Sequence, residues 1–186
     1  MLYNISYNDP KITKLINESV GKPYSFVENF KKGGIGSPKL FITRCSAAIY
    51  DILHVNESVK FCNIELRPNG IIIGFQSRLE VYALVIPYYK LVLFKPGNSV
   101  TFHIDHHYIS IDCSKNRKNT YNFLEKIELE KTKKSYLNNQ LDIELKIVNK
   151  KYNEIFSQSG GIIDEATLKR FQNEVFTPSL ATSSSL

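Results

Sequence analysis

The sequence of 186 residues lacks the features that mark several large classes of protein. Its three cysteines, Cys45, Cys62 and Cys113, are scattered and odd in number, which excludes a disulfide scaffold and is typical of a reducing compartment. No apolar run approaches the roughly 20 residues that a membrane-spanning helix needs. The 42% of hydrophobic residues excludes a wholly disordered chain. The length is enough for one ordinary domain with appendages, or for two small ones.

The first residues also lack the pattern of a secretory signal peptide. Asp9, Lys11 and Lys14 occur where such a peptide would have its apolar stretch. The richest apolar run, residues 81–86, has the length of a strand and ends at Pro87. We therefore expect a cytoplasmic protein without a signal peptide, and this location is compatible with peripheral contact with a membrane.

Positive charge is in excess, with a net charge of +6, and residues 114–137 carry most of that excess. Phosphates of nucleic acids or lipids are attracted by such a cluster. A solvated helix face is the alternative, with Glu130 and Lys134 paired one turn apart, and the interleaved acids favour it. Nucleic-acid binding through a basic helix of residues 115–134 therefore stays an alternative function, with nucleic acid a weaker candidate partner. The basic residues are Lys115, Arg117, Lys118, Lys126, Lys131, Lys133 and Lys134.

Residues 1–38 are predicted to form a helical extension followed by a glycine-rich linker. Apolar residues recur at helical spacing in residues 12–20, and Phe26 and Phe30 are four positions apart. The glycines of residues 33–38 are followed by a strand-like segment, whereas a dinucleotide-binding fingerprint needs a helix there. These glycines therefore indicate a boundary and not a phosphate site.

The period changes to two over residues 39–113, which predicts β-strands. An extended region is expected to open at Leu40 and to continue, with a bend, to Leu53. Strong turns are predicted at residues 67–70 and 95–98, where proline, asparagine and glycine combine. About seven strands joined by short turns predict an antiparallel sheet, which forms a sandwich or closes on itself to protect its edges.

Helical periodicity returns after Cys113. Asn119 or Thr120 can cap a helix that ends near residue 134 and has Leu124 and Ile127 on one side. This helix completes the domain that we place at residues 39–136.

Residues 137–178 are predicted to form a helical hairpin. Residues 141–147 alternate as a strand would, but a longer apolar series at helical spacing favours a helix. Glycines at residues 160–161 end it, and Asp164 looks like the cap of a second helix. The serine-rich tail, residues 179–186, is expected to be disordered. The candidate contacts of a homo-oligomer are Leu141, Leu145, Val148, Tyr152, Leu168 and Phe171.

Two short motifs carry a resemblance to a known family. Residues 69–74 (Asn-Gly-Ile-Ile-Ile-Gly) and 85–91 (Val-Ile-Pro-Tyr-Tyr-Lys-Leu) resemble bacterial pleckstrin-homology-like (PH-like) and GRAM-like domains, where a strand ends in Ile-Pro-Tyr and resumes after a half turn. The resemblance implies a mainly β, α+β fold: a bent antiparallel barrel of about seven strands capped by a C-terminal helix. The hairpin, with Ile162-Ile163 before an acidic cap, is similar to the short C-terminal (SHOCT-like) hairpins that accompany such domains.

The resemblance also implies a binding module, because PH-like domains hold phosphoinositide headgroups, peptides or proteins. We expect a non-enzymatic adaptor that engages a protein partner or the inner membrane surface, without a cofactor, and that forms a homo-oligomer through the hairpin. The candidate ligand-binding residues at the edge of the barrel are Lys39, Arg44, Lys60, Arg78 and Lys90, with Tyr88 and Tyr89.

One cluster favours a different chemistry. Three histidines and Asp105 lie within residues 103–107, and imidazole with carboxylate suits zinc. A metal-dependent hydrolase at His103–His107 is therefore a second alternative. The cluster coincides with a predicted hairpin turn, where adjacent side chains point apart, so we expect an exposed turn and no metal site. No serine or cysteine has a recognisable base beside it in the sequence, and we expect no catalytic residues.

Overall fold

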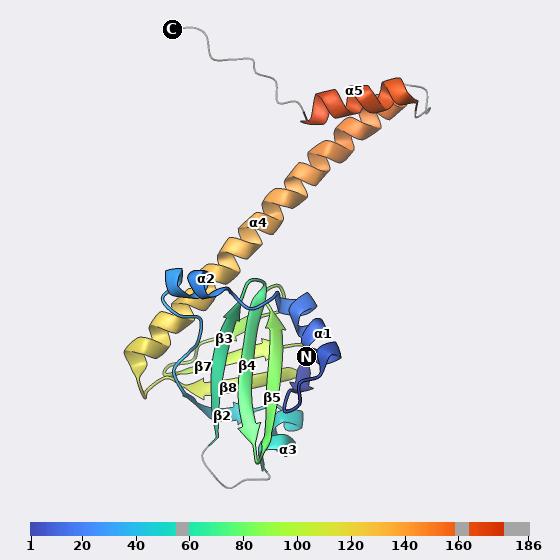
Figure 1. Cartoon of the computed structure of the whole chain (residues 1–186). Helices are drawn as coiled ribbons and strands as arrows, with labels where there is room; N and C mark the ends of the chain where they lie inside the picture. Colours follow the sequence, from blue (N-terminus) through green and yellow to red (C-terminus); the bar gives the residue numbers. More distant parts are fainter. Residues whose placement is uncertain (55–59, 159–163, 177–186) are drawn as a thin grey trace, which may run out of the picture. The chain divides into compact units, whose positions relative to one another are not determined.

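The computed structural model describes residues 1–54, 60–158 and 164–176. Contacts divide the chain into two compact units, Met1–Ser135 and Tyr136–Leu186. The strands described are β1 (Leu2–Asn4), β2 (Leu40–Cys45), β3 (Phe61–Arg67), β4 (Gly70–Ser77), β5 (Glu80–Pro87), β6 (Val92–Phe94), β7 (Ser99–Ile104) and β8 (His107–Asp112) (Figure 1). The helices are α1 (Pro10–Val20), α2 (Phe26–Lys31), α3 (Ala47–His54), α4 (Arg117–Gln158) and α5 (Glu165–Phe176).

The first unit is built on one antiparallel sheet with the strand order β1-β5-β4-β3-β2-β8-β7-β6. The predicted antiparallel sheet is confirmed, within an α+β fold. The prediction of a closed barrel is wrong, because within the described ranges the end strands β1 and β6 do not pair with each other. Each end strand has only three residues, which gives too few ladder hydrogen bonds to close the sheet.

The predicted turn at residues 67–70 joins β3 to β4, and the packing around this turn requires a glycine at residue 70. A Cβ at this position would clash with the carbonyl oxygen of Ile86 and would lie 2.6 Å from Cγ1 of Val20. Glycine therefore lets β5 and α1 approach the start of β4.

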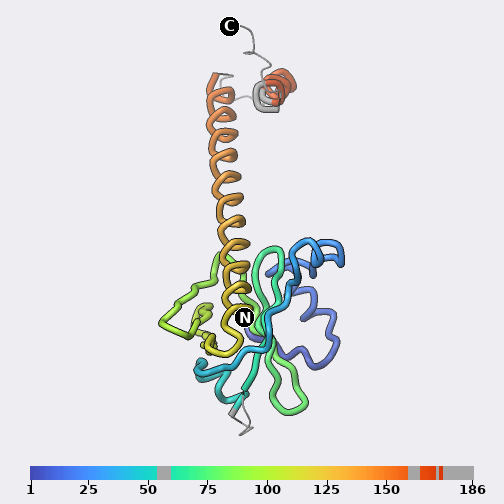
Figure 2. The backbone as a smooth tube through the Cα atoms, turned by 90° about the vertical axis from the view of Figure 1, so that its left-hand side faces the viewer, coloured from blue at the N-terminus to red at the C-terminus, as the bar shows by residue number. Residues whose placement is uncertain are grey.

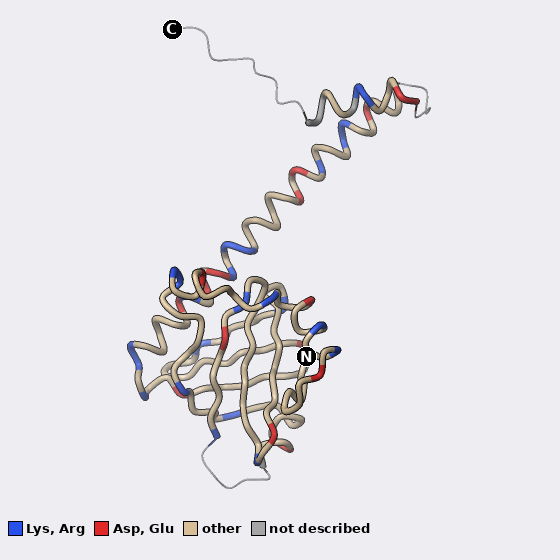
Figure 3. The backbone as a smooth tube through the Cα atoms, in the orientation of Figure 1, with Lys and Arg blue, Asp and Glu red and all other residues tan. Residues whose placement is uncertain are grey.

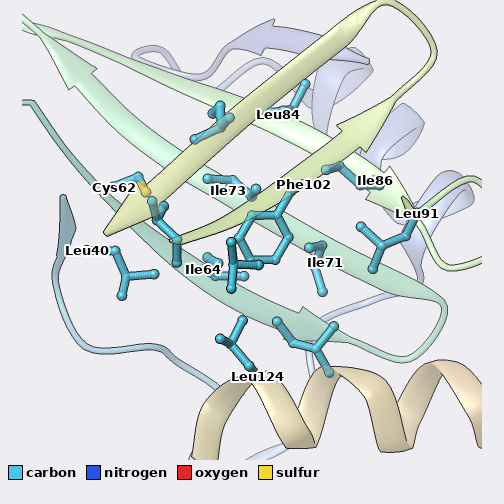
Figure 4. Packing of buried hydrophobic residues seen from close by; sticks show 14 of the residues in the cluster. Leu40, Cys62, Ile64, Ile71, Ile73, Leu84, Ile86, Leu91, Phe102 and Leu124 are labelled. Carbon is cyan, nitrogen blue, oxygen red and sulfur yellow. The ribbon is translucent and has the colours of Figure 1, made fainter. Parts of the chain in front are cut away.

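The core lies on one face of the sheet and is covered by α4. Alternate residues of the strands point inward, and Phe102 of β7 is fully buried at the centre (Figure 4). Leu124 and Ile127 of α4 reach the same cluster, as their predicted common side requires. Helix α4 thus completes the core, which strand pairing leaves open.

The segment predicted as an N-terminal helical extension also contributes a strand. Leu2 and Asn4 of β1 pair with Leu84 and Tyr82 of β5. Helix α1 then buries Val20 in a second apolar cluster, together with residues of β4 and β5. The first 20 residues are therefore part of the sheet unit. A three-residue edge strand has too little pattern to be recognised in a sequence.

The extended region predicted to run from Leu40 to Leu53 is wrong in its second half. After β2, residues Ala47–His54 form helix α3. Ile49 and Leu53 are four positions apart, so one side of this helix enters the core. Packing of these two side chains outweighs the extended pattern that precedes them.

The predicted break between a capping helix that ends near residue 134 and a separate hairpin is wrong. Helix α4 is continuous from Arg117 to Gln158 (Figure 2). The helical interpretation of residues 141–147 is confirmed and the strand alternative is wrong. No glycine or proline occurs between the two ends of α4, so nothing in the chemistry of the chain stops the helix near residue 135.

In the second unit, α5 follows a capping residue that the sequence identifies. The carboxylate of Asp164 accepts a hydrogen bond of 2.7 Å from the backbone N–H of Thr167. Arg170 donates to Gln158 at the end of α4, and Ile155 is buried. The glycine pair at 160–161, Ile162-Ile163 and the tail predicted as disordered lie outside the described residues. No helix of the described chain combines the length and the apolar character that crossing a bilayer requires.

Candidate functional site

The predicted ligand-binding residues lie at different points of the sheet unit. At the starts of β2 and β3, the Lys39 ammonium lies 3.9 Å from the centre of the Phe61 ring. The Lys60 ammonium similarly lies 5.0 Å from the ring centre of Tyr50 on α3. Both cations therefore rest on aromatic faces of the protein itself.

Arg44 lies on β2, and the other four predicted residues follow β4 and β5. Arg78 occupies the β4–β5 turn with a φ of 54°. The Lys90 ammonium pairs with the carboxylate of Asp105 at 3.2 Å. Tyr88 is buried, which raises the pKa of its hydroxyl, whereas Tyr89 is exposed. Tyr88 thus belongs to the core, and Tyr89 is open to solvent.

The histidine cluster forms the β7–β8 turn and its flanks. The rings of His106 and His107 lie 4.1 Å apart, and Asp105 adopts a φ of 51° in the turn. Burial, and then the neighbouring His106, lower the pKa of His107. Within the residues that the structure describes, no three His, Cys, Asp or Glu side chains gather as metal ligands. His103 instead faces outward from β7, with its ring 5.5 Å from that of Tyr108.

The cysteines differ in their access to solvent. Burial raises the pKa of Cys62 to about 12, and burial also raises the pKa of Cys113. Cys45 is partly exposed, but burial raises its pKa too, in spite of the nearby Lys60. The thiolate is the nucleophilic form of cysteine, so none of the three is activated.

The outer face of β2, β8, β7 and β6 is hollowed into a pocket of about 490 Å³, which we call the outer-face pocket. Phe102 and Ile109 point from these strands into the core, so Thr101, His103 and Ser110 point outward. The pocket is lined by Thr43, Arg44, Phe94, Pro96, Asn98, Ser99, Thr101, His103, Tyr108, Ser110 and Asp112.

Hydroxyl groups and one guanidinium define the chemistry of the outer-face pocket. The buried hydroxyls of Thr101 and Ser110 share a hydrogen bond of 2.8 Å. Thr43 donates to the backbone carbonyl of Ser110 at 3.3 Å. Asp112 accepts two hydrogen bonds from Ser114, which lower its pKa. The guanidinium of Arg44 has no hydrogen-bond or ion-pair partner in the described part of the chain. Such a set of groups suits a small polar or anionic ligand.

Helix α2 exposes a small set of apolar side chains, which we call the α2 patch. It consists of Phe26, Val27 and Phe30. Phe26 and Phe30 are 86% and 83% exposed, although their spacing is the one that predicts a buried helix face. The sequence pattern finds the helix but does not reveal that this side is open.

Helix α4 exposes apolar residues on two sides in the second unit. The first stripe consists of Leu137, Leu141, Leu145 and Tyr152 together with the half-buried Val148, and the second consists of Tyr136, Ile143 and Ile147. Leu141 and Leu145 of the first stripe are 56% and 57% exposed. Steps of 100° per residue place the two stripes on roughly opposite sides of the helix. Sequence reasoning identified most of the first stripe and missed the second, which repeats at intervals of seven and four.

Of the other predicted oligomer contacts, Leu168 is exposed on α5, and the side chain of Phe171 lies outside the described set.

The basic residues of α4 in the first unit are largely engaged by the protein itself. Lys126 donates to the carbonyl of Gly33 at 2.8 Å, and Lys131 to that of Leu91 at 2.6 Å. Lys133 pairs with Glu130 at 3.4 Å. Acidic residues alternate with the basic ones along the helix (Figure 3). These contacts leave few free cations for a nucleic-acid backbone.

Comparisons of this chain with protein-family models, with curated proteins and with solved structures found no match.

Proposed function

We propose that this protein is a non-enzymatic binding module that self-associates through helix α4. The observation that carries the proposal is the open apolar surface of α4, with Leu141 and Leu145 more than half exposed. Large apolar patches that are open to solvent mark sites of protein association.

The spacing of the first stripe supports helix–helix association. Leu141, Leu145, Val148 and Tyr152 follow one another at alternating steps of four and three, and the buried Ile155 continues the series after them. This is the heptad pattern of helices that pack side by side. The second stripe lies on the other side of the helix, and a helix that is apolar on two sides is stable when neighbours cover both. Copies of α4 in one bundle provide such neighbours.

The sheet unit supplies the binding role in this proposal. An antiparallel sheet followed by a helix that completes the core agrees with the order of elements in PH-like domains, although the sheet is not closed. The outer-face pocket supports a ligand site that includes Arg44, one of the residues identified from the sequence. An adaptor in which the sheet unit binds and α4 assembles accounts for both features.

Molar mass in solution tests the self-association. Size-exclusion chromatography with light scattering should give a multiple of the 21.3 kDa chain mass. Leu141→Glu with Leu145→Glu should give the mass of a single chain, because two carboxylates then occupy the centre of the first stripe. The matched control is Asn139→Glu with Asn149→Glu, which adds the same charge at exposed positions outside both stripes. This variant should keep the molar mass of the wild-type oligomer. A wild-type protein with the mass of one chain would remove the proposal.

A further inference from the structure

The α2 patch is open to solvent, on a helix that has no buried residue. Along a helix with 100° per residue, Phe26, Phe30 and Val27 fall within about 100° of one another. They therefore form one apolar edge of α2. Isolated apolar residues are common on surfaces, but two almost fully exposed phenylalanines side by side on a short helix are not.

Helix α2 has a closed first turn, and the residues that follow it are tied to α4. At its start, the hydroxyl of Ser25 accepts from the backbone N–H of Glu28, and Glu28 accepts from the backbone N–H of Ser25 at 2.8 Å. After its end, Lys32 pairs with Glu130 of α4 at 2.9 Å. Lys126 of α4 also donates to the carbonyl of Gly33. The C-terminal end of α2 is thus anchored to α4 while both phenyl rings remain exposed.

The charges beside the patch are positive. Lys22 and Lys31 are exposed on either side of the patch in sequence, and the described chain gives them no ion-pair partner. Glu28 is the acidic residue of α2, and its carboxylate accepts hydrogen bonds from the backbone N–H and the hydroxyl of Ser25. Steps of 100° place Glu28 about 200° from Phe26, on the opposite side of α2. Lys31 ends α2 itself, and Lys22 lies beside the end of α1, four positions before Phe26. An apolar edge with ammonium groups before and after it in the chain complements a surface that is apolar inside and anionic outside.

We propose that α2 docks on the surface of an anionic lipid bilayer. Phe26, Val27 and Phe30 enter the headgroup region, while Lys22 and Lys31 meet the lipid phosphates. A protein partner fits less well, because stable protein interfaces bury about 800 Å² on each side and three side chains provide less than that. The α2 patch belongs to Met1–Ser135, so this proposal does not depend on the stripes of α4.

Vesicle flotation of the full chain tests this proposal. The wild-type protein should float with vesicles of phosphatidylcholine and phosphatidylserine, and at least tenfold less with phosphatidylcholine alone. Raised salt should reduce flotation, because it screens the lysines. Phe26→Ser with Phe30→Ser should lower the bound fraction at least tenfold, and Lys22→Glu with Lys31→Glu should also lower it.

The matched control is Tyr7→Ser with Leu79→Ser, which removes two equally exposed apolar side chains outside α2 and should leave flotation unchanged. Thermal unfolding monitored by circular dichroism should be the same for all these variants. The proposal is overturned if the wild type does not float with the anionic vesicles, or if the Phe26→Ser, Phe30→Ser variant floats as well as the wild type. A fall in molar mass of that variant without any vesicle binding would assign the patch to a protein contact instead. Molar mass measured on the same samples reports on self-association separately.

Discussion

The ammonium of Lys32 lies 2.9 Å from the carboxylate of Glu130, and this ion pair links the residue after α2 to helix α4. Both side chains are more than two-thirds buried. Burial opposes the charge of Glu130, but the hydrogen bond from Lys32 and the charges of Lys32 and Lys133 outweigh it and hold the pKa of the carboxyl below its usual value. The pair therefore stabilises the folded protein at neutral pH.

We expect Glu130→Gln to lower the free energy of unfolding by about 1 kcal/mol at neutral pH. Since the pKa of Glu130 is depressed in the folded state, its contribution is fully present above the unfolded value of about 4.3 and is lost as the pH falls through the folded value. The difference between variant and wild type should therefore shrink in acid. Urea denaturation at neutral pH and at about pH 3 measures both differences.

Glu18→Gln is the control for this experiment. It removes an exposed pair with Lys14, whose charged atoms lie 3.9 Å apart, and should change stability little at either pH. An effect of Glu130→Gln that is equally large in acid would show that the charge of Glu130 is not the stabilising feature.

Gly70→Ala should destabilise the sheet unit by about 3 kcal/mol, because the added methyl group meets the carbonyl of Ile86 and the side chain of Val20. Urea denaturation gives the difference. Gly36→Ala is the matched control: an added Cβ there has no heavy atom within 4 Å, and its effect should stay below about 1 kcal/mol. Equal effects of the two substitutions would argue against close packing at Gly70.

The thiols should react in an order set by their burial. With a thiol reagent at mildly alkaline pH, Cys45 should react slowly in the native protein, while Cys62 and Cys113 stay protected until urea unfolds the chain. Mass spectrometry counts the modified thiols. Cys45→Ser should remove the native-state reaction altogether. Rapid modification of Cys62 in the folded protein would contradict its burial on the core side of β3.

Several parts of the fold could be predicted because they depend on local pattern. The turn at residues 67–70 follows from proline, asparagine and glycine in sequence, and the common side of Leu124 and Ile127 follows from helical spacing. Helix α3 could not be predicted, since its two core residues, Ile49 and Leu53, fit an extended pattern equally well. Strand β1 depends on pairing with β5, about 80 positions away, for which no local pattern exists.

The candidate sites were harder to predict than the elements that carry them. The predicted lysines share charge, but Lys39 and Lys60 lie on aromatic rings and Lys90 pairs with Asp105, contacts that only the folded chain creates. Helical spacing identifies an apolar side and leaves open what covers it, as Phe26 and Phe30 show. The outer-face pocket could have been suspected from polar residues at every second position of two adjacent strands.

The hydrogen bond between Thr101 and Ser110 should contribute to stability as a coupled pair. Both hydroxyls are buried, so removing one leaves the other without its partner. Thr101→Val and Ser110→Ala should each lower the free energy of unfolding by about 1 kcal/mol. The double variant should lose less than the sum, by about 1 kcal/mol, because the second substitution removes a group that is already unpaired.

A double-mutant cycle that combines Thr101→Val with Ser99→Ala is the control for the Thr101 and Ser110 pair. Ser99 donates to the carbonyl of Pro96 and not to Thr101. The coupling free energy between Thr101 and Ser99 should be close to zero. If the Thr101 and Ser110 effects simply add, the two hydroxyls do not depend on each other in solution. The outer-face pocket would then have a looser polar lining than the structure gives it, and hydroxyl groups that are not held in place recognise a ligand less selectively.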